Sequence, residues 1–207
     1  MKPKILVLKT DGTNCDEETS FAFELAGGNP KIVHINDLRK KEETLKNYQI
    51  LALPGGFSYG DDIVSGKILA IELTSFFSEE LKKFIQRKDT AIIGVCNGFQ
   101  ILVRTGLLPF AKLGEMKVTL TNNDCGHFEC RWINLKMEEK SRCPFTKNLN
   151  LVSYQVAHGE GKFFSDEKTI SEIEKLNLVA LRYCDKNGKP TQKYPDNPNG
   201  AINAIAG

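Results

Sequence analysis

The sequence predicts an α/β protein built on a doubly wound, mostly parallel sheet. Over the first hundred residues, short apolar runs alternate with amphipathic stretches whose apolar spacing suits helices. Three of the apolar runs lead into polar or glycine-rich loops, as expected where parallel strands end at a binding crevice. In addition, residues 94–98 read GVCNG, which places a cysteine between two glycines at a predicted strand-to-helix turn.

The elements follow in chain order. Strands are predicted at 4–9, 32–35, 50–53 and 91–95. Helices are predicted at about 16–26, at 42–47 and at 73–87, and a further helix follows Cys96. In the C-terminal half, residues 128–133 alternate like a strand, and 186–189 suggest a hairpin turn between 180–183 and 191–194.

Length and composition limit the classes of function. A chain of 207 residues fits a single domain, residues 1–207, with a substantial core. The net charge is +2 with acids and bases interspersed, so no nucleic-acid partner is expected, and no apolar run reaches membrane length. Six scattered cysteines in a chain of this size suggest reduced thiols and a cytoplasmic location.

The turn around Cys96 is the main candidate for chemistry. Glycines on both sides allow two backbones to pass closely while Cys96 is held strained and exposed. The following helix points the positive end of its dipole at the sulfur, which favours the thiolate. The alternative is a buried structural cysteine, but packing alone needs no glycine on either side.

Two other loops are expected to converge on Cys96. Residues 54–62 (PGGFSYGDD) follow a buried strand, and paired glycines leave backbone N–H groups free to face an oxyanion. A backbone N–H of this paired-glycine segment and the N–H of Asn97 are the candidate donors, although an ordinary glycine turn is the alternative. The loop at 10–14 is a weaker candidate, because a Thr/Gly/Asn loop before a helix can also cradle phosphate.

Several motifs together carry a resemblance to a known family. Residues 94–100 (GVCNGFQ), 55–61 (GGFSYGD) and 157–161 (AHGEG) resemble class I glutamine amidotransferases. Within that class, three further stretches look like the glutaminase subunit or domain of phosphoribosylformylglycinamidine synthase, an enzyme of purine biosynthesis: 14–16 (NCD), 126–132 (GHFECRW) and 194–200 (YPDNPNG). The resemblance extends from Lys4 to Gly207.

The resemblance implies a flavodoxin-like fold with a nucleophile elbow and a glutaminase reaction. Cys96 would attack the side-chain amide of glutamine, forming a thioester and releasing ammonia. The ammonia would pass to a synthetase subunit that uses ATP and Mg, so this chain itself would need no cofactor. A small accessory subunit is a further candidate partner.

The resemblance also assigns site residues. Gly56 and Asn97 would hold the oxyanion through their backbone N–H groups. Residues that would contact substrate glutamine are Gly55, Gln100, His158 and Gly159.

One part of the family pattern has no match. The family takes its catalytic base from a C-terminal His-Pro-Glu turn, whereas the histidines here are His34, His127 and His158. The expectation is that residues 1–207 lack a C-terminal segment carrying His-x-Glu. Two alternatives stay open: a non-catalytic binding module, and a substitute base formed by His158 with Glu160. A cysteine-elbow hydrolase or protein-repair enzyme is a further alternative, but it leaves the Gly55–Gly56 loop with Gln100 unexplained.

A zinc site is an alternative role for four residues: Cys125, His127, Cys130 and Cys143. The Cys-x-His-x-x-Cys spacing is unusual for zinc, and the strand-like alternation would send Cys130 to one face. The sequence therefore favours structural roles for these residues and no metal.

Overall fold

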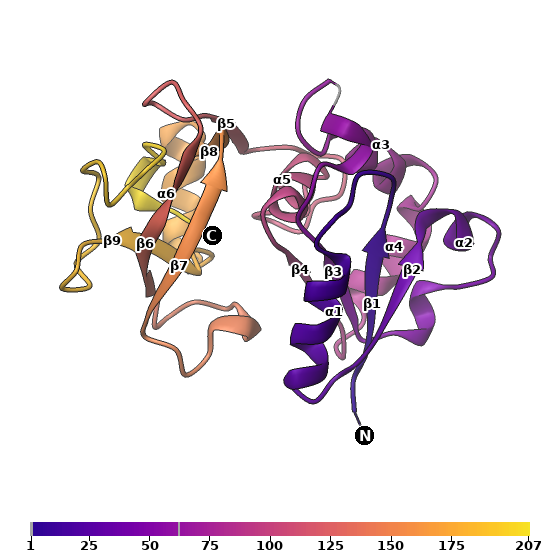
Figure 1. The fold of residues 1–207 in the computed structure, drawn as a ribbon. Helices are drawn as coiled ribbons and strands as arrows, with labels where there is room; N and C mark the ends of the chain where they lie inside the picture. Colours follow the sequence, from indigo (N-terminus) through magenta and orange to yellow (C-terminus); the bar gives the residue numbers. More distant parts are fainter. Residues whose placement is uncertain (1, 62) are drawn as a thin grey trace. The chain divides into compact units, whose positions relative to one another are not determined.

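The computed structural model describes residues 2–61 and 63–207. The chain forms two compact units, Met1–Met116 and Lys117–Gly207 (Figure 1). Residue 62, the last of the predicted loop 54–62, lies outside the described part. The single amidotransferase domain over residues 1–207 remains a prediction, since compact units and family domains divide a chain by different criteria.

The first unit is organised around a four-stranded parallel sheet in the order β2-β1-β3-β4. Its strands are β1 (Lys4–Lys9), β2 (Asn29–His34), β3 (Ile50–Leu53) and β4 (Ala91–Gly94). All four predicted strands are confirmed, but β2 begins three residues earlier than expected. It includes Pro30, which an edge strand tolerates because one side of it donates no ladder hydrogen bonds.

Helices cover both faces of this sheet, which confirms the doubly wound arrangement. Leu6 and Leu8 point into a core formed with helices from later in the unit, whereas Ile5 and Val7 point to the opposite face and pack near Phe23. Phe23 belongs to α1 (Asp16–Leu25). The helices on the other face are α2 (Ile35–Arg39), α3 (Lys67–Ser75), α4 (Ser78–Gln86) and α5 (Asn97–Arg104).

Two helix predictions were wrong in their limits. The stretch 73–87 forms the end of α3 and all of α4, because the helix breaks at Phe76–Phe77 and restarts at Ser78. The stretch 42–47 forms only a short 3-10 helix, Leu45–Asn47. Helix α2 was not predicted; it is short, and its capping box pairs the unusual cap His34 with Asp37.

The second unit is built from antiparallel strands. One sheet pairs β5 (Thr119–Asn122) with β8 (Glu160–Phe164), and the other has the order β7-β6-β9. The remaining elements are β6 (Glu129–Met137), β7 (Leu151–His158), α6 (Glu167–Lys175) and β9 (Leu181–Cys184).

The two C-terminal predictions fare differently. The strand predicted at 128–133 is confirmed as the first part of the longer β6. At the predicted hairpin, β9 and the turn after it form, but residues 191–194 do not make a strand. Among the described helices, none combines the length and apolar character needed to cross a membrane.

Candidate active site

Cys96 lies at a strained turn between β4 and α5. Its backbone has φ +54° and ψ −112°, a conformation that residues other than glycine rarely adopt. A Cβ added at Gly94 would lie 2.4 Å from the carbonyl oxygen of Gly98, and one added at Gly98 would lie 1.9 Å from the carbonyl oxygen of Leu53. Both glycines are therefore required for the close passage of backbones that the sequence indicated.

Two backbone N–H groups are directed at the Cys96 sulfur. Burial raises the pKa of the Cys96 thiol above its ordinary value, and the charge of Asp61 raises it further. Hydrogen bonds from the N–H groups of Asn97 and Gly56 lower it, but by less. The net direction is upward, opposite to the lowering that a helix dipole favouring the thiolate would give. Cys96 is nevertheless accessible from solvent.

The expected convergence of the glycine-rich loops is confirmed within the first unit. Residues 11–15 run beside residues 55–59, joined by hydrogen bonds from Phe57 N–H to Gly12 C=O (2.9 Å) and from Tyr59 N–H to Asp11 C=O (2.7 Å). The N–H of Cys15 donates to Gly55 C=O at 3.3 Å. These backbone hydrogen bonds tie the first loop to the Gly55–Gly56 segment.

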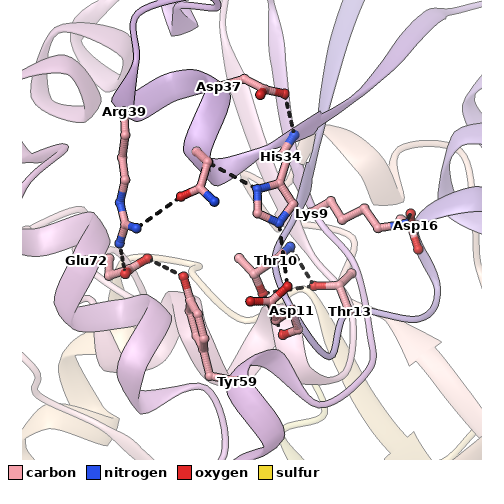
Figure 2. A network of polar contacts seen from close by, with 11 residues as sticks. Lys9, Thr10, Asp11, Thr13, Asp16, His34, Asp37, Arg39, Tyr59 and Glu72 are labelled. Carbon is pink, nitrogen blue, oxygen red and sulfur yellow. Dashed lines mark hydrogen bonds and ion pairs between the residues drawn. The ribbon is translucent and has the colours of Figure 1, made fainter.

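Side chains behind these loops tie them to the sheet and to α3 (Figure 2). Lys9 pairs with the buried Asp16 at 2.6 Å, and the hydroxyls of Thr10 and Thr13 lie 3.2 Å apart. The hydroxyl of Tyr59 donates to Glu72 of α3 at 2.8 Å. Arg39 contacts the same carboxylate.

The side chain of Asn97 occupies the space between the elbow and the second loop. It is 2% exposed, and its Oδ1 accepts hydrogen bonds from the backbone N–H (3.3 Å) and hydroxyl (2.7 Å) of Ser58. Its Nδ2 donates to Asp61 Oδ1 and to Gln100 Oε1, both at 3.1 Å. The sequence singled out Asn97 for its N–H alone and offered no signal for these side-chain contacts.

In the second unit, His158 and Gly159 lie where β7 leads into β8. The Nδ1 of His158 is 3.1 Å from Asn123 Oδ1, and the N–H of Gly161 donates to the same oxygen at 3.2 Å. Asn123 Nδ2 donates to the carbonyl of His158 at 2.8 Å. Burial lowers the pKa of His158, and its Nε2 is buried with no hydrogen-bond partner among residues 2–61 and 63–207. Sequence reasoning missed Asn123, which belongs to no motif.

The turn at 194–200 supports the same segment. Asn199 is fully buried, and its Nδ2 donates to Gly161 C=O (2.8 Å) and to the hydroxyl of Tyr183 (2.9 Å). Asn197 Oδ1 accepts from the N–H groups of Gly200 and Ala201. The asparagines of this motif therefore act as structural hydrogen-bonding groups.

The candidate metal ligands do not assemble as considered. The structure brings Cys125 and His127 together with Glu129, and Cys130 and Cys143 are not part of this group. Glu129 is 2% exposed and is bonded by Arg131 (2.6 Å), Tyr194 (3.1 Å) and His127 (3.0 Å). Burial raises the pKa of Glu129, but hydrogen bonds from Arg131, Tyr194 and Cys125 outweigh it and hold the pKa below its ordinary value. The cluster is therefore explained by the buried carboxylate of Glu129, whose oxygens receive hydrogen bonds from the surrounding side chains.

Comparison with known proteins identifies the family. Residues 2–207 match the model of the CobB/CobQ-like glutamine amidotransferase domain. The chain is 48% identical to the phosphoribosylformylglycinamidine synthase subunit PurQ of Dehalococcoides mccartyi over 100% of this chain and 79% of that protein. It is 43% identical to the PurQ subunit of Methanococcus maripaludis (strain C7), over 99% and 76% of the two chains.

The fold agrees with this result. A chain in the structure of PurLQS from Thermotoga maritima matches with a TM-score of 0.73 and 30% identity, over 99% of this chain and 80% of that one. A second Thermotoga maritima glutamine amidotransferase, 17% identical with a TM-score of 0.51 over 81% and 64%, shares the fold alone. The chain thus belongs to the glutamine amidotransferases, in the family of the PurQ subunit of phosphoribosylformylglycinamidine synthase.

Proposed function

We propose that this chain is the glutaminase component of phosphoribosylformylglycinamidine synthase and that Cys96 is its nucleophile. The observation that supports this most directly is the convergence of two backbone N–H groups, from Gly56 and Asn97, on the sulfur of a cysteine held at φ +54°. Donors placed beside a nucleophile are what an acyl-transfer reaction needs, because negative charge develops on the carbonyl oxygen next to the attacking atom.

The chemistry proceeds in two steps. The Cys96 sulfur, as thiolate, attacks the side-chain amide carbon of glutamine, and the N–H groups of Gly56 and Asn97 stabilise the resulting oxyanion. The C–N bond breaks, the nitrogen leaves with an added proton as ammonia, and a γ-glutamyl thioester remains. Water then attacks the thioester, which releases glutamate and returns the thiol.

The remaining assignments complete the proposed site. Gly55 is placed beside the nucleophile, since a Cβ there would lie 3.4 Å from Cys96 Cβ. Gln100 is proposed to contact glutamine, and its Oε1 also accepts a hydrogen bond from Asn97 Nδ2. His158 and Gly159 remain proposed glutamine-binding residues, and burial within the second unit lowers the pKa of His158.

The proposal includes partners and a location. Ammonia is of use only if a synthetase subunit consumes it, and the related Thermotoga maritima structure is a PurLQS assembly. We propose a synthetase subunit as the main partner, with ATP and Mg bound there, and a small subunit as a second partner. A cytoplasmic location agrees with six cysteines that are all free thiols in the structure.

Covalent labelling tests the nucleophile. A diazo-ketone analogue of glutamine is expected to form one adduct on Cys96, located by mass spectrometry of peptides. Cys96→Ser should abolish the adduct, and Cys15→Ser is the matched control, because Cys15 is the other exposed thiol beside Gly55. An adduct on Cys15 with Cys96 unmodified would refute the assignment and favour a non-catalytic role for the elbow.

A further inference from the structure

We propose that the side chain of Asn97 is a positioning group that locks the Ser58–Asp61 turn onto the start of α5, so that the N–H groups of Gly56 and Asn97 converge on Cys96. The inference rests on the proposed function and adds a role for Asn97 that is separate from its backbone N–H. It follows from the contacts of one buried amide.

The amide group of Asn97 is fully used, and its orientation is fixed. Ser58 contributes a backbone N–H, which can only donate, so the atom facing it must be the Asn97 oxygen. The Asn97 nitrogen therefore faces two acceptors, a carboxylate oxygen of Asp61 and Oε1 of Gln100. A buried group satisfied on both sides holds its neighbours in a single arrangement.

The turn that Asn97 holds is strained. Tyr59, Gly60 and Asp61 all have positive φ (+54°, +71° and +54°) within the 3-10 segment Ser58–Asp61. Such a conformation costs about 1 kcal/mol for each non-glycine residue, so it persists only where surrounding contacts impose it. Gly56 lies two residues before Ser58, and a shift of this turn would therefore move its N–H away from the sulfur.

Asp61 extends the connection to a third element. Its Oδ1 accepts a hydrogen bond from the N–H of Gly66 at 2.9 Å, and Gly66 is the residue directly before α3. One amide thus joins the loop after β3, the nucleophile helix α5 and, through Asp61, the start of α3. Aspartate at position 97 could not donate to Asp61, and leucine could neither donate nor accept.

Two reagents distinguish the positioning of the N–H donors from the intrinsic reactivity of the Cys96 thiol. Iodoacetamide needs only the thiolate, whereas the glutamine-like diazo-ketone also needs its carbonyl held near the donors. In the full chain, Asn97→Asp is expected to slow diazo-ketone labelling of Cys96 by about 100-fold, as loss of an oxyanion donor does. Iodoacetamide alkylation of Cys96, compared at equal thiolate fraction, should change by less than about 3-fold.

Further variants isolate the contacts. Ser58→Ala removes one donor to Asn97 and is expected to slow diazo-ketone labelling by about 10-fold, because one hydrogen bond of about 1.4 kcal/mol is lost. Asp61→Asn should instead lower the apparent pKa of Cys96, read from the pH dependence of alkylation, because it removes a nearby negative charge. Asn187→Ala, at an exposed asparagine in the turn after β9, is the control and should leave both reactions unchanged.

Each outcome decides between distinct conclusions. If wild-type Cys96 is labelled but Asn97→Asp and Ser58→Ala are labelled at the wild-type rate, the positioning role is wrong while the nucleophile stands. If wild-type Cys96 is not labelled, the proposed function itself fails. Should Asn97→Asp not fold, as circular dichroism would show, Ser58→Ala decides the question, and diazo-ketone labelling of that variant at the wild-type rate overturns the inference.

Discussion

The glycines around Cys96 are individually indispensable for steric reasons that sequence reasoning could predict. Gly98→Ala would place a methyl group against the main chain of β3, 1.9 Å from the Leu53 oxygen, which can move only if α5 shifts. We expect a loss of about 3 kcal/mol in the free energy of unfolding, measured by urea denaturation. Gly27→Ala is the control: it has φ +85° but open space around it, so about 1 kcal/mol is expected. Equal losses would show that strain at positive φ, not the close approach, dominates.

His158 provides a pH-dependent prediction. Asn123 Oδ1 accepts from Gly161 N–H, so it also faces His158 as an acceptor, and the proton of the neutral imidazole must lie on Nδ1. Burial lowers the pKa of His158 below the ordinary 6.5. As the pH falls below that value, the unfolded chain takes up the proton first, so His158 reduces stability on acidification and has no such effect at higher pH.

Nitrogen-15 NMR of the three histidines measures both properties. The His158 signals, assigned by their loss in His158→Gln, should show the Nδ1–H tautomer and titrate below pH 6.5. Asn123→Asp should raise that pKa, because a carboxylate favours the imidazolium. A wild-type His158 that titrates above 6.5, or that carries its proton on Nε2, would contradict the hydrogen-bond assignment.

Among single residues, the sequence predicted those whose type is dictated by local backbone geometry. Cys96 and its flanking glycines are examples, because a strand-to-helix turn of this kind has a recognisable pattern. Asn97 and Asn123 illustrate what could not be predicted. Most of their side-chain bonds are to partners 35 to 39 positions away, such as Ser58 and His158, and a single sequence contains no trace of such pairings.

At the level of elements, the strands were easier to predict than the helices. The central strands β1 and β3 are apolar runs whose burial on both faces is evident from composition. The helix limits failed where local hydrogen bonds compete with the helix: Thr74 and Ser75 bond back to the carbonyls of Ala70 and Ile71, near the end of α3. Apolar spacing continues across that break, so periodicity alone could not locate it.

The 3-10 segment Ser58–Asp61 is held from α3 as well as from α5, and this yields a prediction. Tyr59→Phe removes the hydrogen bond to the buried carboxylate of Glu72 (Figure 2). A cost of about 1.5 kcal/mol in the free energy of unfolding is expected, since the acceptor is charged and keeps Arg39 as its other partner. Thermal and urea denaturation measure it.

The same variant should also affect the site. A looser Tyr59 frees the turn that precedes Asp61, so labelling of Cys96 by the diazo-ketone is expected to slow by a few-fold. Tyr154→Phe is the control, because Tyr154 is 49% exposed, and a change within about 0.5 kcal/mol is expected. If both variants behave alike, the Tyr59–Glu72 contact contributes nothing to the turn.

Across the whole molecule, sheet topology could be predicted where strands and helices alternate regularly along the chain. It could not be predicted where the paired strands are far apart in the sequence. In the first unit, the alternation of strands and helices leaves few possible topologies, and the parallel sheet follows. In the second unit, β5 pairs with β8 some forty residues later, and β6 lies between β7 and β9. Nothing in the composition of these segments specifies such partners, so the sequence indicated single strands there but not the sheets.

Whether Cys96 has a general base depends on histidines from different parts of the chain. His34 ends β2, which three strand spacings, about 14 Å, separate from β4. His127 is paired with Glu129 at 3.0 Å, and the family's His-Pro-Glu turn has no match in the 207 residues. Loss of a general base costs about 10²- to 10⁴-fold in turnover, although a cysteine keeps some reactivity without one.

We therefore expect a polypeptide of residues 1–207, assayed for glutamate release with the proposed synthetase subunit, to turn over glutamine at least about 100-fold more slowly than a relative that carries the His-Pro-Glu turn. The Dehalococcoides mccartyi subunit, of which the chain spans 79%, is a suitable reference. Labelling of Cys96 should persist, which separates a missing base from a damaged nucleophile. Turnover at the rate of the relative, abolished by His158→Ala but not by His34→Ala or His127→Ala, would instead identify His158 as the base and refute this prediction.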